Sequence, residues 1–531
     1  MTDNLADLLG RAAEQSPDRL ALIEPATGRR VTWAELDREV DQVARGLAEL
    51  GLVAGYRVLV SLANRVEFVT VYLAALRSRL VAVPVNPRAA TGELVRMLAD
   101  CGARLVVAGP ATAVTLRAAV AGLQDALVGA DEELRARTPV PRIVVVGTRS
   151  LPGETTYDEL LSEQGTAAVP PHDPEALAVL LYTSGTSGAP RAAMLSHRAL
   201  VANIEQVAAV QPPMLEPADV VLGVLPLFHV YGLNAVLGQV LDRQATLVVV
   251  DGFDADGTLD LVASQAVTVL PVAPPVFAHW RGVPDLRQRL ASVRLCLSGS
   301  APLPAEAVRA FTDATGIPVH QGYGLTEAAP VVTSTLCSRA PKPGSVGAAL
   351  PGVTIRLVDE TGAAPEGADP GEIQVAGDNL FSGYWPDGAE APGADGWFAT
   401  GDVGFLDADG DLFLVDRLKD LVIVSGFNVY PSEVEDVLRE VDAVADAAVI
   451  GADDERTGEA VVAYVVRRAD SSLTDAEVAD AVREHCGSRL ARFKQPAVVH
   501  VVADLPRSLT GEVSRGRLRE RGRRRSTGLL E

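Results

Sequence analysis

Residues 180–191 read Leu180-Leu181-Tyr182-Thr183-Ser184-Gly185-Thr186-Ser187-Gly188-Ala189-Pro190-Arg191, and they follow an apolar, strand-like run that begins at Ala176. Four hydroxyls and two glycines fill the six positions from Thr183 to Gly188. Glycines let the backbone approach a ligand closely, and bare amides and hydroxyls are suitable donors to phosphate oxygens. The spacing does not fit the Walker pattern, and its composition is also typical of a surface linker. With Arg191 as a terminal cation, we interpret the run as a candidate phosphate loop.

Length and composition narrow the classes of protein. The chain has 531 residues, 48 % hydrophobic and 22 % charged, which predicts a globular protein of two or more domains. A net charge of −22 argues against a nucleic-acid partner, because phosphate backbones need clustered cationic surface. No secretory signal and no membrane span is readable. We expect a cytoplasmic protein, because the cysteines lack metal-ligand spacing and are predicted to be buried, reduced thiols: Cys101, Cys296, Cys337 and Cys486.

Strand-like and helix-like segments alternate through the large first part of the chain. The strands are nearly continuous apolar runs, which favours parallel sheets covered by helices on both faces. A capping box at Thr32 and Glu35 predicts the first helix start. The predicted strands are 57–62, 81–85, 104–108 and 142–146, and the predicted helices include 66–77, 93–99 and an Ala-rich stretch within 111–137.

The C-terminal part has a different, α+β pattern. Strands are predicted at 411–415, 447–450 and 461–466, and capping boxes at Ser432/Glu435 and Thr474/Glu477 predict two helices. The predicted fold class is therefore α/β, with a large N-terminal domain of parallel-rich sheets plus a β-subdomain, and a small C-terminal α+β domain.

Several further small-residue turns follow apolar runs. They are Pro226-Leu227-Phe228-His229-Val230-Tyr231-Gly232, Ser298-Gly299-Ser300-Ala301-Pro302, Gln321-Gly322-Tyr323-Gly324-Leu325-Thr326-Glu327 and Trp397-Phe398-Ala399-Thr400-Gly401-Asp402. Taken alone, the glycines are explained by turns, and His229 by a buried core position. An aromatic face suits a purine, however, and a carboxylate oxygen suits Mg²⁺.

These motifs, in this order along nearly the whole chain, resemble the adenylate-forming superfamily of acyl- and aryl-CoA synthetases, nonribosomal peptide adenylation domains and luciferases. The acyl-CoA ligase branch is the nearest match. The resemblance implies that Glu327 holds Mg²⁺ and that Asp402, with Arg417, binds the ribose. The nucleotide-binding residues implied by the resemblance are Thr183, Ser184, Gly185, Thr186, Ser187, Gly188, Arg191, Gly299, Ser300, Ala301, Gly322, Tyr323, Gly324, Thr326, Asp402 and Arg417.

The resemblance also implies an acyl site and a pivot. His229 is expected between the carboxylate end of the acyl site and the CoA channel, and the acyl pocket is expected around Phe228, Val230, Val276, Phe277 and Gly324. Lys419 matches the hinge, and Gly426 matches the loop that lines the pantetheine tunnel. The expected domains are 1–416, a hinge at 417–419, and a small mobile domain at 420–531.

The chain departs from the family at its last motif. Where the family has Gly-Lys before the final Arg, this chain reads Pro506-Arg507-Ser508-Leu509-Thr510-Gly511-Glu512-Val513-Ser514-Arg515, so Glu512 replaces the catalytic lysine. Adenylation brings a carboxylate to the α-phosphate of ATP, and a cation lowers that repulsion, whereas a carboxylate adds to it. Thiol attack on a finished acyl-adenylate does not need the lysine. Arg191-Ala192 also replaces the usual Lys-Gly on the phosphate side.

We therefore interpret the chain as an acyl-CoA ligase homologue with lost or impaired adenylation, of the kind found in platensimycin-type diterpenoid pathways. It would combine coenzyme A with the adenylate of a bulky apolar acid, supplied by a separate adenylating enzyme, with Mg²⁺ needed only if ATP is used. Two alternatives stay open. One is a complete ATP-dependent ligase in which Arg507 or Arg515 reaches the lysine's place, and the other is an inert binding paralogue.

A basic run closes the chain, from Arg515 through Arg517, Arg519, Arg521, Arg523, Arg524 and Arg525. A charge run at a terminus is usually solvated and frayed. The alternative is that part of the run attracts the phosphates of coenzyme A.

Overall fold

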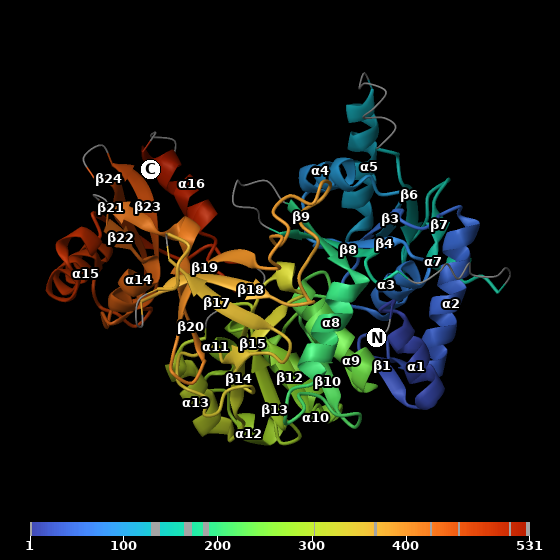
Figure 1. Cartoon of the computed structure of the whole chain (residues 1–531), viewed down its shortest axis with the longest axis horizontal. Coiled ribbons are helices and arrows are strands. Elements are labelled where there is room, and N and C mark those ends of the chain that lie inside the picture. The colour runs from blue at the N-terminus through green and yellow to red at the C-terminus, as the bar shows by residue number, and fades with distance from the viewer. Residues whose placement is uncertain are drawn as a thin grey trace.

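The structure is a computed structural model that describes residues 3–128, 138–163, 173–183, 191–301, 303–359, 361–365, 369–424, 427–454, 457–508 and 511–526. Figure 1 shows a large N-terminal domain and, at the left, a smaller domain that contains the C-terminal elements. The fold is α/β, with mostly parallel sheets and helices in the large domain. This arrangement confirms the predicted fold class.

The first sheet contains the strands that lead into the phosphate loop. Its order in the described residues is β7-β6-β5-β3-β4-β8-β9, and neighbouring strands are parallel except β8 and β9. The strands are β3 (Arg57–Ser61), β4 (Val81–Pro84), β5 (Leu105–Ala108), β6 (Arg142–Val145), β7 (Thr155–Thr156), β8 (Leu177–Thr183) and β9 (Arg191–Ser196). The sequence therefore predicted β3 to β6 to within a residue or two at each end.

Helices cover both faces of this sheet, as β3 illustrates. Side chains of Val58 and Val60 lie in the same buried cluster as those of α2 (Trp33–Glu49) and α3 (Val66–Arg77). The side chain between them, Leu59, lies in a different cluster with α4 (Thr91–Cys101) and α5 (Ala113–Leu127). Alternate residues of a strand point to opposite faces, so β3 is buried on both sides, which explains its continuous apolar sequence.

The second sheet holds the remaining parallel strands of the large domain. Its order in the described residues is β16-β15-β14-β13-β12-β10-β11-β1-β2, with antiparallel pairing only towards the two ends. The strands are β1 (Leu20–Glu24), β2 (Arg29–Thr32), β10 (Val220–Gly223), β11 (Thr246–Val249), β12 (Val269–Val272), β13 (Leu295–Ser298), β14 (Val319–Gly324), β15 (Val331–Ser334) and β16 (Ala348–Ala349).

The other helices of the large domain surround these sheets (Figure 1). They are α1 (Asp7–Gln15), α7 (Tyr157–Leu160), α8 (His197–Ala208), the π-helix η1 (Tyr231–Gly238), α9 (Gln239–Arg243), α10 (Ala255–Ser264), α11 (Pro275–Trp280), α12 (Leu286–Arg289), α13 (Ala305–Thr315) and the 3-10 turn η2 (Thr326–Ala328).

A separate antiparallel sheet precedes the small domain. It contains β17 (Thr354–Val358), β18 (Gly371–Ala376), β19 (Phe398–Leu406) and β20 (Leu412–Arg417). After the 3-10 turn η3 (Leu418–Asp420), the chain enters the sheet of the small domain, which contains β21 (Val422–Val424), β22 (Phe427–Val429), β23 (Val444–Asp454), β24 (Gly458–Arg467) and β25 (Val498–Val502). Its helices are α14 (Pro431–Arg439), α15 (Asp475–Arg489), the 3-10 turn η4 (Arg492–Lys494) and α16 (Arg515–Ser526).

Two expectations for the C-terminal part were wrong. The strand predicted at 411–415 is β20, which pairs with β19 and so belongs to the sheet before the small domain. The capping box predicted at Ser432 and Glu435 does not form, since the N-cap of α14 is Tyr430 and makes no side-chain cap. Tertiary partners take both side chains instead, as the contacts of Ser432 and Glu435 below show. The capping boxes at Thr32/Glu35 and Thr474/Glu477 are confirmed.

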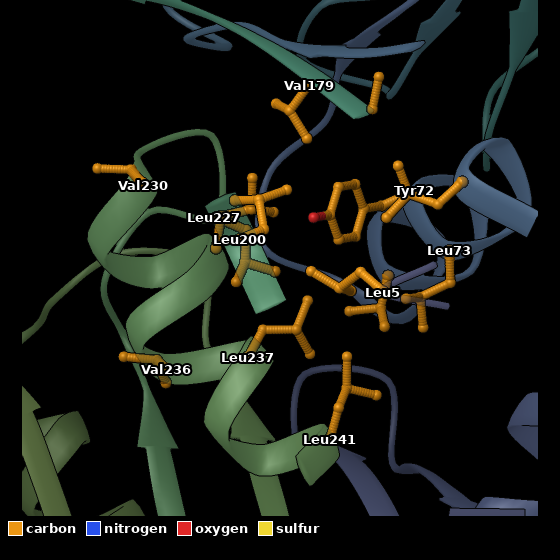
Figure 2. Packing of buried hydrophobic residues seen from close by; sticks show 14 of the residues in the cluster. Leu5, Tyr72, Leu73, Val179, Leu200, Leu227, Val230, Val236, Leu237 and Leu241 are labelled. Atoms are coloured by element: carbon orange, nitrogen blue, oxygen red, sulfur yellow. The ribbon is translucent and has the colours of Figure 1, made fainter. Parts of the chain in front are cut away.

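The interior of the large domain joins the N-terminal helices to the segment after β10. Figure 2 shows Leu5, Tyr72 and Leu73 on one side, facing Leu237 and Leu241 of the η1–α9 helix on the other. The same cluster includes Leu200, Leu227 and Val230. This packing fixes where the chain emerges from the core at His229.

None of the helices in the described residues combines the length and apolar character that crossing a membrane requires. The cysteines, all within the described residues, are free thiols, and Cys101, Cys296 and Cys486 are buried.

Helix α2 provides a test of this packing. A Cβ at Gly46 would lie 2.1 Å from the carbonyl oxygen of Leu160, whereas a Cβ at Gly10 in α1 would meet nothing within 4 Å. We predict that Gly46→Ala lowers the free energy of unfolding by about 1–3 kcal/mol through overpacking. Gly10→Ala should raise it by up to about 1 kcal/mol, because alanine loses less entropy in a helix. Urea unfolding of both variants measures this, and equal effects would contradict the packing of α2 on α7.

Candidate functional site

The predicted turns meet at the carboxyl ends of β12, β13 and β14. These strands are parallel, with Val272 beside Ser298 and Ser298 beside Gln321. The turn 298–301 and the motif that contains Tyr323 therefore start at the same edge of the second sheet. Ligands of open α/β sheets bind outside the carboxyl ends of the strands, so this edge is the candidate site.

The turn after β13 carries buried hydroxyls. The side-chain oxygens of Ser298 and Ser300 are buried and have no hydrogen-bond partner within the described part of the chain. Ser300 also has a φ of 74°, a conformation that residues other than glycine rarely adopt. A Cβ at Gly299 would lie 3.0 Å from Cε1 of Tyr231, so this turn packs closely on the start of η1. Buried hydroxyls left without partners are suited to a ligand.

Tyr323 and Asp402 are brought together from different sheets. Tyr323, on β14, is 7 % exposed, and its hydroxyl donates to Oδ2 of Asp402, on β19, at 2.6 Å. A Cβ at Gly322 would lie 2.7 Å from the carbonyl oxygen of Thr333. A Cβ at Gly324 would lie 2.2 Å from the carbonyl oxygen of Pro330. Close approach of the neighbouring backbone thus explains both glycines. The resemblance assigns the aromatic ring to adenine and the carboxylate to ribose, and both roles stay predictions.

A chain of polar contacts connects Glu327 to Arg191. The Tyr384 hydroxyl donates to Oε1 of Glu327 at 2.6 Å, and the Arg191 guanidinium carbon lies 3.8 Å from the centre of the Tyr384 ring. The same guanidinium forms an ion pair with Glu390 at 2.8 Å. Burial and the Glu327 carboxylate raise the pKa of Tyr384 above its ordinary value. Arg191 therefore has both a stacking partner and a counter-ion.

Parts of the expected nucleotide site lie outside the described residues. They are Ser184, Gly185, Thr186, Ser187 and Gly188, together with Gly426 of the expected tunnel. For Arg417 and Lys419 only the backbone is described, at the end of β20 and in η3. Thr183 ends β8, and its hydroxyl lies 3.4 Å from the Arg191 carbonyl oxygen. Thr326 begins η2, and Ala301 follows Ser300 at the carboxyl edge of the second sheet.

His229 lies at the entrance to the π-helix η1. Its backbone N–H donates to the carbonyl oxygen of Pro226 at 3.1 Å, and its Nδ1 accepts from the N–H of Tyr231 at 3.3 Å. With Nδ1 as acceptor, the neutral imidazole carries its proton on Nε2. Burial lowers the pKa of His229 to about 4, so the ring is uncharged at neutral pH. It can donate a hydrogen bond but adds no positive charge.

The residues expected around the acyl group divide between two buried clusters. Val230 is 2 % exposed and packs in the large cluster of Figure 2. Val276 and Phe277 belong to the other cluster, in which the Phe277 ring lies 5.1 Å from that of Phe311 in an edge-on contact. Phe228, two residues before Val230, is half-buried. Their role in acyl binding stays a prediction.

The loop that carries Glu512 contacts the large domain. Gly511 has a φ of 92°, and a Cβ there would lie 2.6 Å from Cγ of Pro275, the first residue of α11. The turn is closed by the N–H of Ser508, which donates to the Glu512 carbonyl oxygen at 2.8 Å. Position 512 is thus next to a residue that touches the segment following β12, at the same edge as the site.

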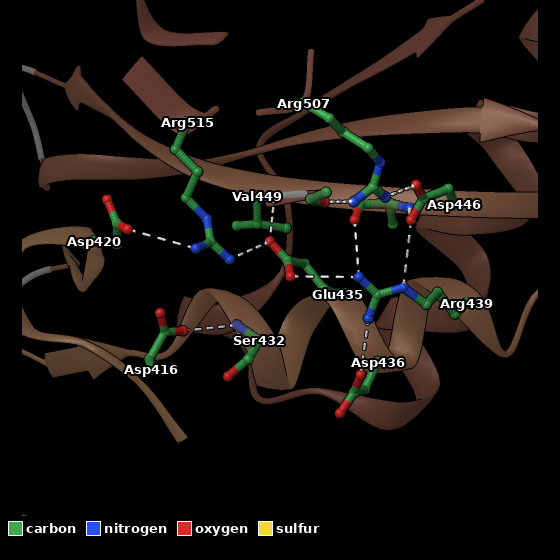
Figure 3. A network of polar contacts seen from close by, with 12 residues as sticks. Asp416, Asp420, Ser432, Glu435, Asp436, Arg439, Asp446, Val449, Arg507 and Arg515 are labelled. Atoms are coloured by element: carbon green, nitrogen blue, oxygen red, sulfur yellow. Dashed lines mark hydrogen bonds and ion pairs between the residues drawn. The ribbon is translucent and has the colours of Figure 1, made fainter. Parts of the chain in front are cut away.

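Two arginines flank position 512, and both have partners in the small domain (Figure 3). Arg507 pairs with Asp446 and donates to the Gly511 carbonyl oxygen. Arg515 donates to Oε1 of Glu435 at 2.8 Å and lies 3.5 Å from Asp420. Both guanidinium groups thus already have carboxylate partners, with which a substrate anion would have to compete.

The side chains of the missing capping box belong to the same region (Figure 3). The Ser432 N–H donates to Oδ2 of Asp416 at 2.9 Å, and its hydroxyl donates to the Val415 carbonyl oxygen. Glu435 accepts from the Val449 N–H at 2.8 Å as well as from Arg515. Helix α14 thus connects β20 to the loop around position 512.

The basic C-terminal run is not frayed at its start. Residues 515–526 form α16, in which Leu518 is fully buried. Arg515 and Arg519 both pair with Asp420, and the Arg519 contact is 2.6 Å long. Arg517 and Arg521 are exposed. Among the described side chains of the run, Arg517 and Arg521 are therefore the arginines open to an outside anion, and the contact with coenzyme A stays a prediction.

The residues present fit magnesium only in part. Glu327 offers a carboxylate, but no cluster of three or more His, Cys, Asp or Glu that could hold a metal ion occurs among the described residues. Magnesium is commonly bound by one or two carboxylates plus substrate phosphates and water. Glu327 would therefore hold Mg²⁺ only together with a phosphate-bearing substrate, where the ion would neutralise phosphate charge.

Three residues around the candidate site were not predicted from the sequence: Asn64, Tyr384 and Glu390. Tyr384 belongs to a Gly-Tyr-Trp run visible in the sequence, but its contact with Glu327 spans 57 positions. No local pattern marks Glu390 or Asn64, whose partners are distant in sequence.

Comparisons with known proteins agree with this geometry. A model of the family "AMP-binding enzyme" matches residues 9–385, and one of the "AMP-binding enzyme C-terminal domain" matches residues 433–512. The chain is 33 % identical to 4-coumarate–CoA ligase 5 of Oryza sativa subsp. japonica over 514 residues, which cover 94 % of this chain and 91 % of that protein.

Solved structures also resemble the chain. ATP-bound MatB from Rhodopseudomonas palustris is 33 % identical, with a TM-score of 0.85 over 98 % of this chain and 99 % of that one. The apo structure of MatB, at the same identity and coverage, has a TM-score of 0.73. The overall arrangement is therefore more similar to that of the ATP-bound structure.

Asp402 provides a test of the nucleotide site. If its carboxylate accepts the ribose hydroxyls, Asp402→Ala loses charged hydrogen bonds of about 1.5–3 kcal/mol, an affinity loss of about 10- to 150-fold. Tyr323→Phe removes only the phenol donor and should lower the affinity less than Asp402→Ala does. Calorimetric titration with a non-hydrolysable acyl-sulfamoyl adenosine measures both. Asp395→Ala is the control, because Asp395 is 61 % exposed and pairs with Arg356. Equal affinities for Asp402→Ala and the control would exclude Asp402 from the site.

The low pKa of His229 predicts how stability depends on pH. The folded-state value of about 4 lies below the ordinary value of about 6.5, so between these values only the unfolded chain binds the proton. Stability from this group is therefore lost as the pH falls from about 6.5 to 4, by up to about 1.4 kcal/mol per unit. His229→Gln should show a shallower loss in urea unfolding from pH 7 to 4.5. Identical slopes would contradict a buried neutral imidazole.

Proposed function

Because the chain belongs to the AMP-binding enzyme family and has acyl-CoA ligases among its relatives, we propose that it forms a CoA thioester from a preformed acyl-adenylate. In this proposal its capacity to make the adenylate from ATP is lost or strongly impaired. The observation that carries the proposal is Glu512, in the place of the catalytic lysine and on a loop that contacts Pro275.

The electrostatic consequence of Glu512 is large. Two unit charges about 4 Å apart interact by roughly 4 kcal/mol at an effective dielectric constant of 20. Replacing an attractive contact by a repulsive one therefore raises the barrier to adenylation by several kcal/mol, or on the order of 10⁴-fold in rate. Since Arg507 and Arg515 have partners in the small domain, neither replaces the missing cation in this arrangement.

A second feature on the phosphate side supports the same proposal. Arg191, which closes the phosphate loop, is paired with Glu390 and stacked on Tyr384. Phosphate oxygens of ATP would have to compete with the Glu390 carboxylate for this guanidinium. Glu327, which would hold Mg²⁺, already accepts the Tyr384 hydroxyl. Both groups that would neutralise the extra phosphates of ATP thus have protein partners.

The features that an acyl-adenylate needs are present together. Support comes from the hydrogen bond between Tyr323 and Asp402, the residues proposed for adenine and ribose, and from the neutral imidazole of His229, which we propose for the acyl site. In the reaction, the thiol sulfur of coenzyme A forms a bond to the acyl carbon. The bond from that carbon to the phosphate oxygen breaks, AMP leaves with the electron pair, and the thiol proton passes to solvent. A neutral His229 can donate a hydrogen bond near the acyl carbon. Because the ring carries no positive charge, it does not draw the phosphate of the adenylate out of its own site.

We further propose that a separate enzyme supplies the adenylate and that the acid is bulky and apolar, as the apolar surroundings of Val230 and Phe277 suggest. The proposed division is at 417–419, with 1–416 and 420–531 as the moving parts and Lys419 as pivot. Support comes from the strand pairing, because β20 and β21 belong to different sheets. Gly426 would line the thiol tunnel after the pivot turns.

The charge at position 512 can be varied to test the proposal. We predict that wild type shows background ATP–pyrophosphate exchange with 4-coumarate and decanoate, yet forms thioesters from the corresponding synthetic acyl-AMPs. Glu512→Lys should raise exchange at least about 100-fold, because it restores the cation, and leave thioester formation within a few-fold. Glu512→Gln should give an intermediate exchange rate. Asp504→Lys, which makes the same charge change at an exposed position, is the matched control.

Each alternative has a distinct outcome in this experiment. Robust exchange by wild type would establish a complete ATP-dependent ligase. Absence of both exchange and thioester formation, in wild type and Glu512→Lys alike, would favour an inert paralogue. If Glu512→Lys shows only background ATP–pyrophosphate exchange but still makes thioesters, then the pairing of Arg191 with Glu390, rather than Glu512, prevents the use of ATP.

A further inference from the structure

Asn64 joins the two large sheets at their carboxyl edges. It lies between the end of β3 and the start of α3, is 8 % exposed, and reaches the segment that follows β10 in the other sheet. Its Nδ2 donates to the carbonyl oxygens of Gly223 at 3.1 Å and Leu225 at 2.8 Å. Its Oδ1 accepts from the N–H of Leu227 at 2.9 Å.

These bonds use both ends of one amide. Two N–H donors and one oxygen acceptor bind alternate residues of a single segment, so the side chain fixes the path of residues 223–227. No other side chain of this size offers two donors and an acceptor in one plane. Alanine would leave the buried backbone groups of Leu225 and Leu227 without this partner.

The segment held by Asn64 leads directly to His229. Pro226 lies within it, and its carbonyl oxygen accepts the N–H of His229 at 3.1 Å. The same oxygen leaves no room for a Cβ at Gly232, which would lie 2.4 Å away. The start of η1 is thus built against Pro226. Leu227 and Val230, which flank His229 in the sequence, are 1 % and 2 % exposed and belong to the core cluster of Figure 2.

The imidazole follows the path of this backbone. Nδ1 of His229 accepts from the N–H of Tyr231, so the direction of Nε2–H is set by the turn 226–231. A shift of residues 223–227 would move both the ring and its backbone anchor. The side chain of Asn64 therefore fixes residues 223–227 through three hydrogen bonds, and Pro226 within this segment binds the backbone of His229. No flexible side chain lies between these contacts.

We propose that Asn64 is the positioning residue for His229, holding the imidazole in place for thioester formation from across the boundary between the two sheets. This inference rests on the proposed function for the reaction, but the placement of the ring can be measured without it. Asn64 itself does not contact the reacting atoms in this proposal, and it acts only through the segment 223–229.

The test compares two buried asparagines whose side chains both donate to backbone carbonyl oxygens. Asn4 is the matched control, because its Nδ2 donates to the Leu76 carbonyl oxygen at 2.9 Å, in α3, far in the chain from His229. Asn64→Ala and Asn4→Ala are compared in urea unfolding, in single-turnover thioester formation from 4-coumaroyl-AMP or decanoyl-AMP, and in an NMR titration of labelled histidine. His229→Gln assigns the His229 resonance. Asn64→Asp, which keeps the size and the acceptor for Leu227, carries the test if Asn64→Ala does not fold.

We expect Asn64→Ala to slow thioester formation about 10- to 100-fold, since a displacement of about 1 Å costs a reaction that much. The pKa of His229 should rise from about 4 towards 6.5 as the ring loses its buried position. Asn4→Ala should lose comparable stability with a rate within two-fold of wild type and an unchanged titration. An Asn64 variant that keeps the low His229 pKa and the control's rate would overturn the proposal.

The two proposals fail in different ways. If wild type makes no thioester from either adenylate, the proposed function fails, and the histidine titration alone decides whether Asn64 positions the ring. If wild type is active and the Asn64 variants match Asn4→Ala in both rate and titration, only the positioning role is lost.

Discussion

The parallel pairing of β12, β13 and β14 is the constraint on which the site depends. Parallel strands end at the same edge of a sheet, so loops that are far apart in sequence emerge side by side there. β10 belongs to the same sheet, and the segment after it carries His229. The first sheet adds Asn64 from the end of β3, and the antiparallel sheet adds Asp402. The site is therefore a place where three sheets meet, and its precision depends on contacts between them.

Charge then divides the site into two halves. The protein carries a net charge of −22, so any bound phosphate is opposed by the overall field unless a local cation compensates. On the side expected for the β- and γ-phosphates, Arg191 is paired with Glu390. Glu512 is expected elsewhere, where a substrate carboxylate would meet the α-phosphate. In the proposed function both features oppose the reaction with ATP, whereas thiol attack on a finished adenylate needs neither the extra phosphates nor the lysine.

The sequence predicted the fold class and the bounds of β3 to β6, because both follow from local apolar patterns. The meeting of the turns at one edge became visible only with the parallel pairing of β12, β13 and β14. Prediction from the sequence failed where a tertiary partner competed with a local one. Ser432 and Glu435 have capping-box spacing, yet Val415, Asp416 and Arg515 take their hydrogen bonds. The π-helix at Tyr231 is set by the close contact of Gly232 with Pro226, which no periodicity reveals.

Contacts over long separations were equally hidden. Asn64 reads as an ordinary loop residue, and its partners lie 159 to 163 positions away. Tyr384 and Glu390 belong to the candidate site because Tyr384 contacts Arg191 and Glu327 and because Glu390 pairs with Arg191. Residues of a local motif can be singled out from the sequence, although their roles stay predictions, whereas contacts between two distant residues are not visible there.

The anchoring of the loop around position 512 bears on how the departure from the family is interpreted. Arg507 and Arg515 fix its two ends within the small domain, and Gly511 adopts a positive φ against Pro275. In the proposed function, Glu512 changes the electrostatics of adenylation alone, because thiol attack on a finished adenylate does not need the lysine. The contacts of Arg507, Gly511 and Arg515 with Asp446, Pro275 and Glu435 do not involve the Glu512 side chain, so a change of charge at position 512 leaves them in place. This combination is the reason that we propose a restricted reaction rather than an inert paralogue.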